Sequence, residues 1–292
     1  MQNFNEKISF IWKIAELLRG PYKPEQYGNV VLPLAVLRRF DCLLEDTKQI
    51  VIEKAKTTDI EMILNRLTGH GFSNKSNFGF ANLLDDPDNI RANFESYIQG
   101  FSTNIREIVE NFDFEKEIKK LDDNNMLFLV IKEFSQIDLH PDTVTNQEMG
   151  YIFEELIRRF SENAEAGDHY TPREVIELMT NILFNHLEQE LVQEGSIFTV
   201  GDFACGTGGM LSVATHHIQR LNPNAQIEVF GQELNPQSYA ICKSDILIKG
   251  QKEKNIVLGN SFTADGHRGE KVRFALMNPP FGVLPNMMNL VQ

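Results

Sequence analysis

Four consecutive residues near the end of the chain, Asn278-Pro279-Pro280-Phe281, have the groups needed to hold an amino group on a planar ring. The two prolines lack backbone donors and have fixed φ angles, and Pro279 favours an extended conformation at Asn278. The segment therefore predicts a stiff turn that presents an amide, a carbonyl and an aromatic ring. These groups could accept both N–H bonds of an exocyclic amine and stack on its ring. A plain strand-ending turn would use the same residues.

A glycine-rich segment, Asp202-Phe203-Ala204-Cys205-Gly206-Thr207-Gly208-Gly209, follows a strand-like run over 197–203. Its glycines permit positive φ angles and a close approach of the backbone to a ligand, and the helix after it begins with free N–H groups. No Lys-Ser/Thr pair follows, and the glycine spacing is not that of a dinucleotide fold. We predict either a tight strand–helix turn or a site for a small ligand with an amino-acid end.

Polar residues also follow the next two strand-like runs. Glu233 ends the run 227–233, where a carboxylate can accept hydrogen bonds from ribose hydroxyls, although a lone carboxylate is more often a solvated surface group. Gly259-Asn260-Ser261-Phe262 follows the run 256–258. Its amide and hydroxyl groups suit the edge of a purine, but such residues are common in loops.

The segment His169-Tyr170-Thr171-Pro172-Arg173-Glu174 predicts the start of a helix. Thr171 as N-cap, Pro172 as the first helical residue and Glu174 two positions later would form a capping box. Capping does not account for the His-Tyr pair. We interpret the pair either as packing residues or as one wall of a ligand pocket beside the start of the helix.

Two domains are expected to position these segments. The first, residues 1–145, is predicted to be helical, and the boundary falls in the Pro141-containing stretch 138–146. The second, residues 146–292, is predicted to be an α/β domain with a parallel sheet, where ligands bind beyond the carboxyl ends of the strands. Its strand-like runs 197–203, 227–233, 256–258 and 272–277 alternate with helical runs 172–189, 209–221 and 236–249.

Composition narrows the class of protein. The chain has 292 residues, 42% hydrophobic and 24% charged, which is a normal globular balance. Runs of 18 apolar residues and a secretory signal are absent from the sequence, so no membrane span is predicted. Cys42, Cys205 and Cys242 have no metal-site spacing. We therefore predict no metal site and a reducing, cytoplasmic location.

The net charge of −13 argues against strong DNA binding by the chain alone. Residues 1–145 hold 17 basic and 23 acidic residues, and residues 146–292 hold 11 and 18. Because phosphate contacts require clustered Lys and Arg, a protein that acts on DNA with this charge would need a partner to hold the DNA.

The order of these motifs resembles that of the DNA methyltransferases that act on adenine N6. The motifs are Tyr-Thr-Pro-Arg at 170–173, Asp-x-Ala-x-Gly-Thr-Gly-Gly at 202–209, Glu233, Gly-Asn-Ser-Phe at 259–262 and Asn-Pro-Pro-Phe at 278–281. With its helical leader, the chain is similar to the modification (M, HsdM-type) subunit of type I restriction–modification systems. The resemblance implies a helical N-terminal domain followed by a Rossmann-like class I methyltransferase domain.

The resemblance also implies S-adenosylmethionine as methyl donor. Segment 170–173 and the turn 202–209 would hold its methionine end, Glu233 its ribose and 260–262 its adenine; family members often carry Asp where Asn260 stands. The predicted cofactor-binding residues are His169, Tyr170, Thr171, Pro172, Arg173, Asp202, Ala204, Gly206, Thr207, Gly208, Gly209, Glu233, Asn260, Ser261 and Phe262.

The predicted catalytic residues are Asn278, Pro279, Pro280 and Phe281. By this interpretation the target adenine leaves the duplex and stacks on Phe281, because its N6 atom is unreachable inside the helix. The Asn278 side-chain oxygen and the Pro279 carbonyl accept the two N6–H bonds, and the methyl group is transferred by in-line displacement. Catalysis would come mainly from positioning and electrostatics.

The family implies a specificity subunit, a motor–nuclease restriction subunit and double-stranded DNA bound through the assembled complex. The sequence ends eleven residues after Phe281, whereas the family's catalytic domain continues. We therefore expect a truncated domain with an exposed sheet edge and little activity of the chain alone.

Two other functions stay open. Asn-Pro-Pro also occurs in protein glutamine N5-methyltransferases, which generally carry Tyr where Phe281 stands, and the Tyr-Thr-Pro-Arg segment favours DNA. Alternatively, the chain is a non-catalytic module that binds the methyl donor or assists assembly.

Overall fold

The computed structural model describes residues 13–161 and 171–279 and divides into two compact units, Met1–Ala164 and Glu165–Gln292. The helix α9 (Asn146–Ser161), whose residues fall in the predicted second domain, packs against α2 (Gly28–Leu44) of the first unit. The compact units therefore separate after α9, whereas the boundary predicted from sequence lies before it.

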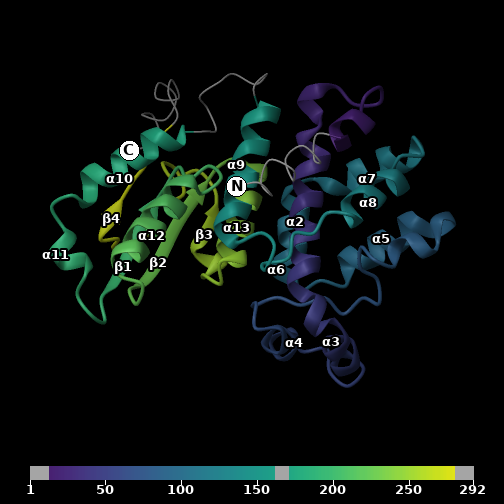
Figure 1. Ribbon diagram of the computed structural model, residues 1–292, viewed down its shortest axis with the longest axis horizontal. Helices are drawn as coiled ribbons and strands as arrows, with labels where there is room; N and C mark the ends of the chain where they lie inside the picture. The colour runs from purple at the N-terminus through teal and green to yellow at the C-terminus, as the bar shows by residue number, and fades with distance from the viewer. Residues whose placement is uncertain (1–12, 162–170, 280–292) are drawn as a thin grey trace. The chain divides into compact units, whose positions relative to one another are not determined.

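The first unit is helical, as predicted, and α2 runs through its core (Figure 1). Most residues of α2 are buried, and α7, α8 and α9 pack around it. The other helices are α3 (Lys48–Ala55), α4 (Glu61–Thr68), α5 (Ile90–Gln99), α6 (Thr103–Asn111), α7 (Phe114–Asp123) and α8 (Leu127–Ser135). Short 3₁₀ turns are η1 (Pro24–Gln26), η2 (Glu45–Thr47), η3 (Leu83–Asp85) and η4 (Pro87–Asn89).

A buried arginine holds the segment before α9 in this unit. Arg39 on α2 is fully buried and donates hydrogen bonds to the carbonyl oxygens of Leu139 and Val144 and to Asn146 Oδ1, the last at 2.6 Å. Because a buried guanidinium needs such partners, these bonds fix the Pro141-containing stretch on α2. Composition alone suggested a linker at this place.

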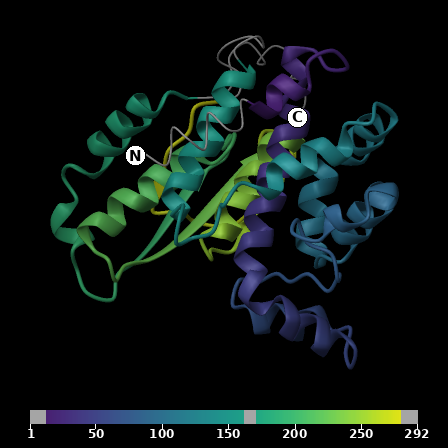
Figure 2. The same ribbon diagram turned by 45° about the vertical axis from the view of Figure 1, so that its right-hand side comes forward.

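The second unit contains a four-stranded parallel sheet in the order β3-β2-β1-β4, which confirms the predicted α/β class (Figures 1 and 2). The strands are β1 (Ile197–Asp202), β2 (Gln226–Glu233), β3 (Ile256–Leu258) and β4 (Phe274–Ala275). The helices are α10 (Arg173–Phe184), α11 (Glu188–Leu191), α12 (Gly209–Leu221), α13 (Pro236–Ile248) and the 3₁₀ turn η5 (Glu253–Asn255).

An apolar core holds helices against this sheet. The helix α12 packs on β1 and on α10, and α13 packs on β2 and β3. Core side chains include Phe198, Val200, Val229, Ile256 and Phe274 from the strands and Leu211, Ala214, Ile218 and Ile246 from the helices. Across the described residues, no helix combines the length and apolar character needed to cross a membrane.

The strand order places the predicted motifs at one edge of the sheet. In the register, Val200 and Gly201 of β1 pair with Phe274 and Ala275 of β4, and β2 lies on the other side of β1. From β1, the chain thus adds β2 and β3 on one side of the sheet and then β4 on the other side. Because all four strands are parallel, the segments after them meet at the same edge, where ligands of such sheets bind.

Candidate functional site

The glycine turn after β1 is a tight loop packed on α13. Gly206 and Gly208 have φ angles of +52° and +87°, and the Gly208 N–H donates to the Cys205 carbonyl at 2.8 Å. A Cβ atom at Gly208 would lie 2.8 Å from Cys242 Sγ. Glycine is therefore required at this position both by its φ angle and by the close approach of α13.

Glu233 connects this turn to the end of β2. Its Oε2 accepts from the Gly206 N–H at 2.8 Å and its Oε1 accepts from the Asn235 N–H at 2.7 Å. Asn235 in turn caps α13, because its Oδ1 accepts from the backbone nitrogens of Gln237 and Ser238. Each carboxylate oxygen keeps a further lone pair, so these bonds leave Glu233 able to accept from a ligand.

Asp202 at the end of β1 is only 2% exposed. Its Oδ1 accepts from the Ala204 N–H at 3.2 Å. Burial raises the pKa of its carboxyl to about 7; the Ala204 N–H opposes this rise, and the nearby charge of Glu233 adds to it. A cationic group of a ligand placed beside Asp202 would favour the ionised form.

The loop after β3 lies against the end of β1. Ser261 Oγ donates to the Phe203 carbonyl, and Asn260 Oδ1 accepts from the Phe262 N–H at 2.9 Å. The Phe262 side chain is 57% exposed, so its ring is available for stacking. Asn260 Oδ1 thus already accepts one hydrogen bond in a local turn. Its second lone pair could accept another from a ligand.

Sequence reasoning missed two side chains that fix this loop. Gln232 donates from Nε2 to the Ala264 carbonyl at 2.8 Å and accepts at Oε1 from the Gly266 N–H at 3.0 Å. His267 Nε2 lies 2.9 Å from the Gly231 carbonyl oxygen, and the His267 ring contacts those of Phe203 and Phe230. In the sequence, the feature that could have indicated such a role is the polar Gln232 inside the strand-like run 227–233.

At the end of β4, the Asn278 side chain contacts the segment before α10. Its Nδ2 lies 3.1 Å from Thr171 Oγ1.

The predicted capping box is wrong, because α10 begins at Arg173 with Pro172 as N-cap and no side-chain capping bond. The Thr171 hydroxyl, released from capping, is instead a partner of Asn278. Arg173 Nε forms an ion pair with Glu177 at 3.0 Å.

The structure thus joins several predicted residues in pairs at one sheet edge. Hydrogen bonds connect Gly206 with Glu233, Ser261 with Phe203, and Asn278 with Thr171. Thr207 lies within the turn, and Gly209 is the first residue of α12. His169, Tyr170, Pro280 and Phe281 lie outside the described residues. The described ranges contain no cluster of three possible metal ligands.

Two family models match the chain in succession. The HsdM N-terminal domain matches residues 8–134, and the N-6 DNA methylase matches residues 144–288. The chain belongs to the HsdM-type N-6 DNA methylase family. The N-6 DNA methylase match includes α9, which by its contacts is part of the helical unit.

Curated relatives of this HsdM-type chain are methylase subunits. It is 25% identical to the type I restriction enzyme MjaIX methylase subunit of Methanocaldococcus jannaschii, over 93% of this chain and 50% of that protein. It is 26% identical to the EcoEI methylase subunit of Escherichia coli, over 61% of this chain and 36% of that protein. The chain thus spans about half the length of MjaIX.

A solved structure supports the fold of this family member. The type I restriction-modification system methyltransferase subunit from Streptococcus thermophilus superposes with a TM-score of 0.72 at 21% identity. The superposition covers 95% of this chain and 63% of that one. It confirms the helical domain followed by the parallel α/β domain.

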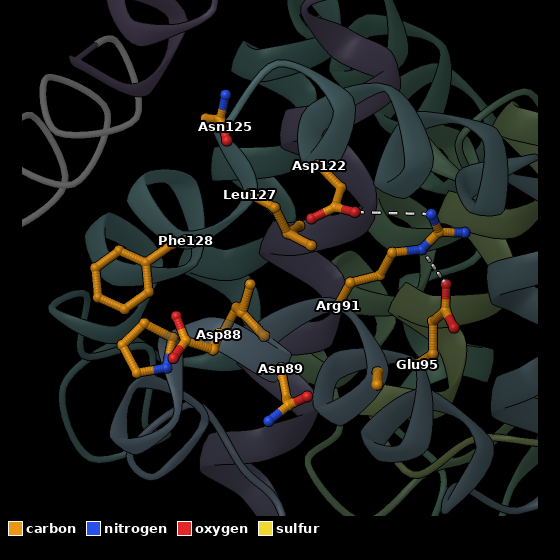
Figure 3. Close-up of a pocket in the computed structure, with 11 residues that line it drawn as sticks. Asp88, Asn89, Arg91, Glu95, Asp122, Asn125, Leu127 and Phe128 are labelled. Carbon is orange, nitrogen blue, oxygen red and sulfur yellow. Dashed lines mark hydrogen bonds and ion pairs between the residues drawn. The ribbon is translucent and has the colours of Figure 1, made fainter.

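The helical unit of this HsdM-type chain has a surface pocket (Figure 3). It has a volume of about 600 Å³ and is lined by residues 87–92, Glu95, Asp122, Asn125, Leu127 and Phe128. The charge of Arg91 is balanced there by Glu95 at 2.8 Å and Asp122 at 3.7 Å, as Figure 3 shows. None of the predicted cofactor or catalytic residues contributes to this pocket.

Proposed function

We propose that this chain is the catalytic part of a type I modification subunit, which transfers a methyl group from S-adenosylmethionine to N6 of adenine in DNA. One observation carries the proposal: Asn278 and the glycine turn 204–209 follow adjacent parallel strands, β4 and β1. An amine held by the first could therefore meet a ligand held by the second. The family match and the methylase relatives support the same reaction.

The residues at this edge fit the proposed methyl donor. The buried Asp202 carboxyl, whose pKa is raised, could pair with the amino group of the methionine end. The tight turn at Gly206 and Gly208 brings backbone close to the ligand, and Glu233 keeps lone pairs for ribose hydroxyls. The exposed ring of Phe262 could stack on the adenine of the donor.

The chain's own residues would act mainly by positioning. The donor supplies a methyl group on a positively charged sulfur. Asn278 Oδ1 and the Pro279 carbonyl would accept the two N6–H bonds of a flipped adenine, which aims the N6 lone pair at that carbon. The N–C bond forms as the C–S bond breaks, the electron pair stays on sulfur, and N6 then loses a proton to solvent. Stacking on Phe281 stays a prediction.

We further propose that the chain functions with partner subunits. The net charge of −13 disfavours phosphate binding by this chain, so a specificity subunit would hold and read the duplex. A motor–nuclease subunit would complete the system, and the assembly would work in the cytoplasm. The type I names of the curated relatives support this assignment.

A methylation assay tests the function. The chain is combined with the specificity subunit from the same system and with tritium-labelled donor, and it is offered either target duplex DNA or a protein with an exposed glutamine. We expect label on adenine N6 of the DNA. Label on the protein would favour the glutamine N5-methyltransferase, and donor binding without transfer to either substrate would favour a non-catalytic module.

Two variants sharpen this assay. Asn278→Ala should bind the donor but lose at least about 10²-fold in transfer rate, because an acceptor aimed at developing charge is removed. Asn224→Ala is the matched control, since this exposed residue precedes β2 at the opposite edge of the sheet. Equal turnover by Asn278→Ala and the control would refute the role of Asn278.

A further inference from the structure

The hydrogen bond between Asn278 and Thr171 joins two motifs 107 residues apart in the chain, at 3.1 Å. An asparagine amide carries one acceptor oxygen and an NH₂ group with two donors, whereas an adenine amino group facing it offers donors. Only one orientation of the amide therefore serves the transfer reaction. In that orientation Oδ1 faces the base and Nδ2 points elsewhere.

The structure shows this orientation of Asn278. Nδ2 is directed to Thr171 Oγ1, and among the described residues no hydrogen bond engages Oδ1. A hydroxyl can accept or donate, so the same pair could form with the amide turned over. A bound adenine amino group selects the orientation in which Oδ1 faces it, and Thr171 can then accept from Nδ2.

Thr171 precedes a helix that packs on α12 through one buried side. It lies two residues before α10, and the buried Ile176 on that helix packs so closely on α12 that a Cβ atom at Gly209 would be 3.2 Å from its Cδ1. The start of α10 is thereby held next to the start of α12, which follows the glycine turn. This packing places the Thr171 hydroxyl within hydrogen-bond distance of Asn278.

We propose that Thr171 is a positioning residue that orients the Asn278 amide toward the methyl-accepting amine. This inference rests on the proposed function. It differs from the role that the family resemblance implies for Thr171, which is binding of the donor. The two roles predict different kinetics: loss of an orienting partner lowers kcat, whereas loss of a donor contact raises the KM and Kd for the donor.

The test compares Thr171→Val with Thr171→Ser in the complex with the specificity subunit. Valine keeps the shape but removes the hydroxyl, and serine keeps the hydroxyl. We expect Thr171→Val to lower kcat about tenfold or more, because Nδ2 loses its partner and the amide can turn over. The Kd for the donor, measured by calorimetry without DNA, should stay within about twofold. Thr171→Ser should restore most of kcat.

Thr180→Val on the same helix is the matched control. The Thr180 hydroxyl is buried, and none of the described residues is its hydrogen-bond partner, so the same substitution removes no bond there. Thr171→Val should also add no further loss to Asn278→Ala. A second measurement needs no turnover: the ¹⁵N-labelled side-chain amide of Asn278 should shift in Thr171→Val and stay unchanged in Thr180→Val.

The outcomes separate the inference from the proposed function. If the wild-type complex methylates adenine and Thr171→Val has the same kcat, the positioning role is wrong while the function holds. If Thr171→Val raises only the Kd for the donor, Thr171 is a donor ligand, and the inference is likewise overturned. A wild-type complex that never methylates adenine would overturn the proposed function together with this inference.

Discussion

Glu233 Oε2 lies 2.8 Å from the backbone nitrogen of Gly206, a residue of the glycine turn that follows the neighbouring strand β1. The other carboxylate oxygen lies 2.7 Å from the backbone nitrogen of Asn235. One side chain therefore connects the ends of β1 and β2 before any ligand is bound. Glu233 shapes the turn in addition to its proposed contact with ribose.

Replacing Glu233 with Gln should weaken both the turn and donor binding. Glutamine offers one acceptor oxygen, and its NH₂ group would face the other backbone N–H, so one partly buried donor loses its partner. We expect the free energy of unfolding to fall by roughly 1 kcal/mol and the Kd for the donor to rise. Thermal denaturation and calorimetry measure the two effects.

Glu194→Gln is the control for this change, because Glu194 is exposed before β1 at the opposite sheet edge. Glu194→Gln should change neither the free energy of unfolding nor the Kd for the donor. If Glu233→Gln were as stable as this control, the carboxylate would have no part in holding the glycine turn.

Donor binding should depend on pH through Asp202. Burial raises the pKa of the free carboxyl to about 7, and a cationic amino group would bind its ionised form. Affinity should therefore fall as pH drops below 7, by about tenfold for each pH unit. Calorimetry between pH 5.5 and pH 8 would measure this slope (roughly the range where the carboxyl titrates). Asp202→Asn should bind weakly with no such slope.

The same group should affect stability in the ligand-free protein. The folded chain holds the Asp202 proton to a higher pH than the unfolded chain does, because the folded-state pKa is raised from 3.8 to about 7. Asp202 therefore lowers stability as pH rises through that interval. Asp202→Asn should raise the free energy of unfolding at pH 8 by up to about 4 kcal/mol. Denaturant titrations at several pH values measure this effect. If the free energy of unfolding had the same pH dependence in Asp202→Asn as in the wild type, the prediction would be contradicted.

Alanine at Gly208 should disrupt the turn more than alanine at Gly195. Both residues have positive φ angles, +87° and +70°, but only at Gly208 would the new Cβ meet an atom, Cys242 Sγ at 2.8 Å. Gly195→Ala therefore measures the φ strain alone, about 1 kcal/mol. Gly208→Ala should cost roughly 1–3 kcal/mol more and lose donor binding. Equal melting temperatures would show that α13 does not constrain the turn.

The chain without partners should bind duplex DNA weakly. Its net charge of −13 repels phosphate, and both of its domains are acidic. In fluorescence anisotropy at about 0.15 M salt, we expect binding of target DNA only after the specificity subunit is added. Tight, salt-sensitive binding by the chain alone would instead reveal a basic surface that the composition does not suggest.

The sequence by itself determined the classes of structure and the order of the motifs. Alternation of strand-like and helical runs predicted the parallel sheet, and the glycines marked the turn after β1 at 206–209, because such patterns reflect local backbone chemistry. Parallel strands then required the motifs to share one edge. Helix-capping rules failed at Thr171, because they consider only neighbouring residues, whereas its hydroxyl bonds Asn278.

Only the tertiary structure decided which polar groups meet and how they are charged. Glu233 bonds a residue 27 positions away and Asn278 one 107 positions away, and neither distance is encoded in local spacing. The raised pKa of Asp202 likewise depends on burial at the end of β1. Hydrogen bonding and desolvation act over a few ångströms in space, so they become definite only when the sheet and its helices are packed.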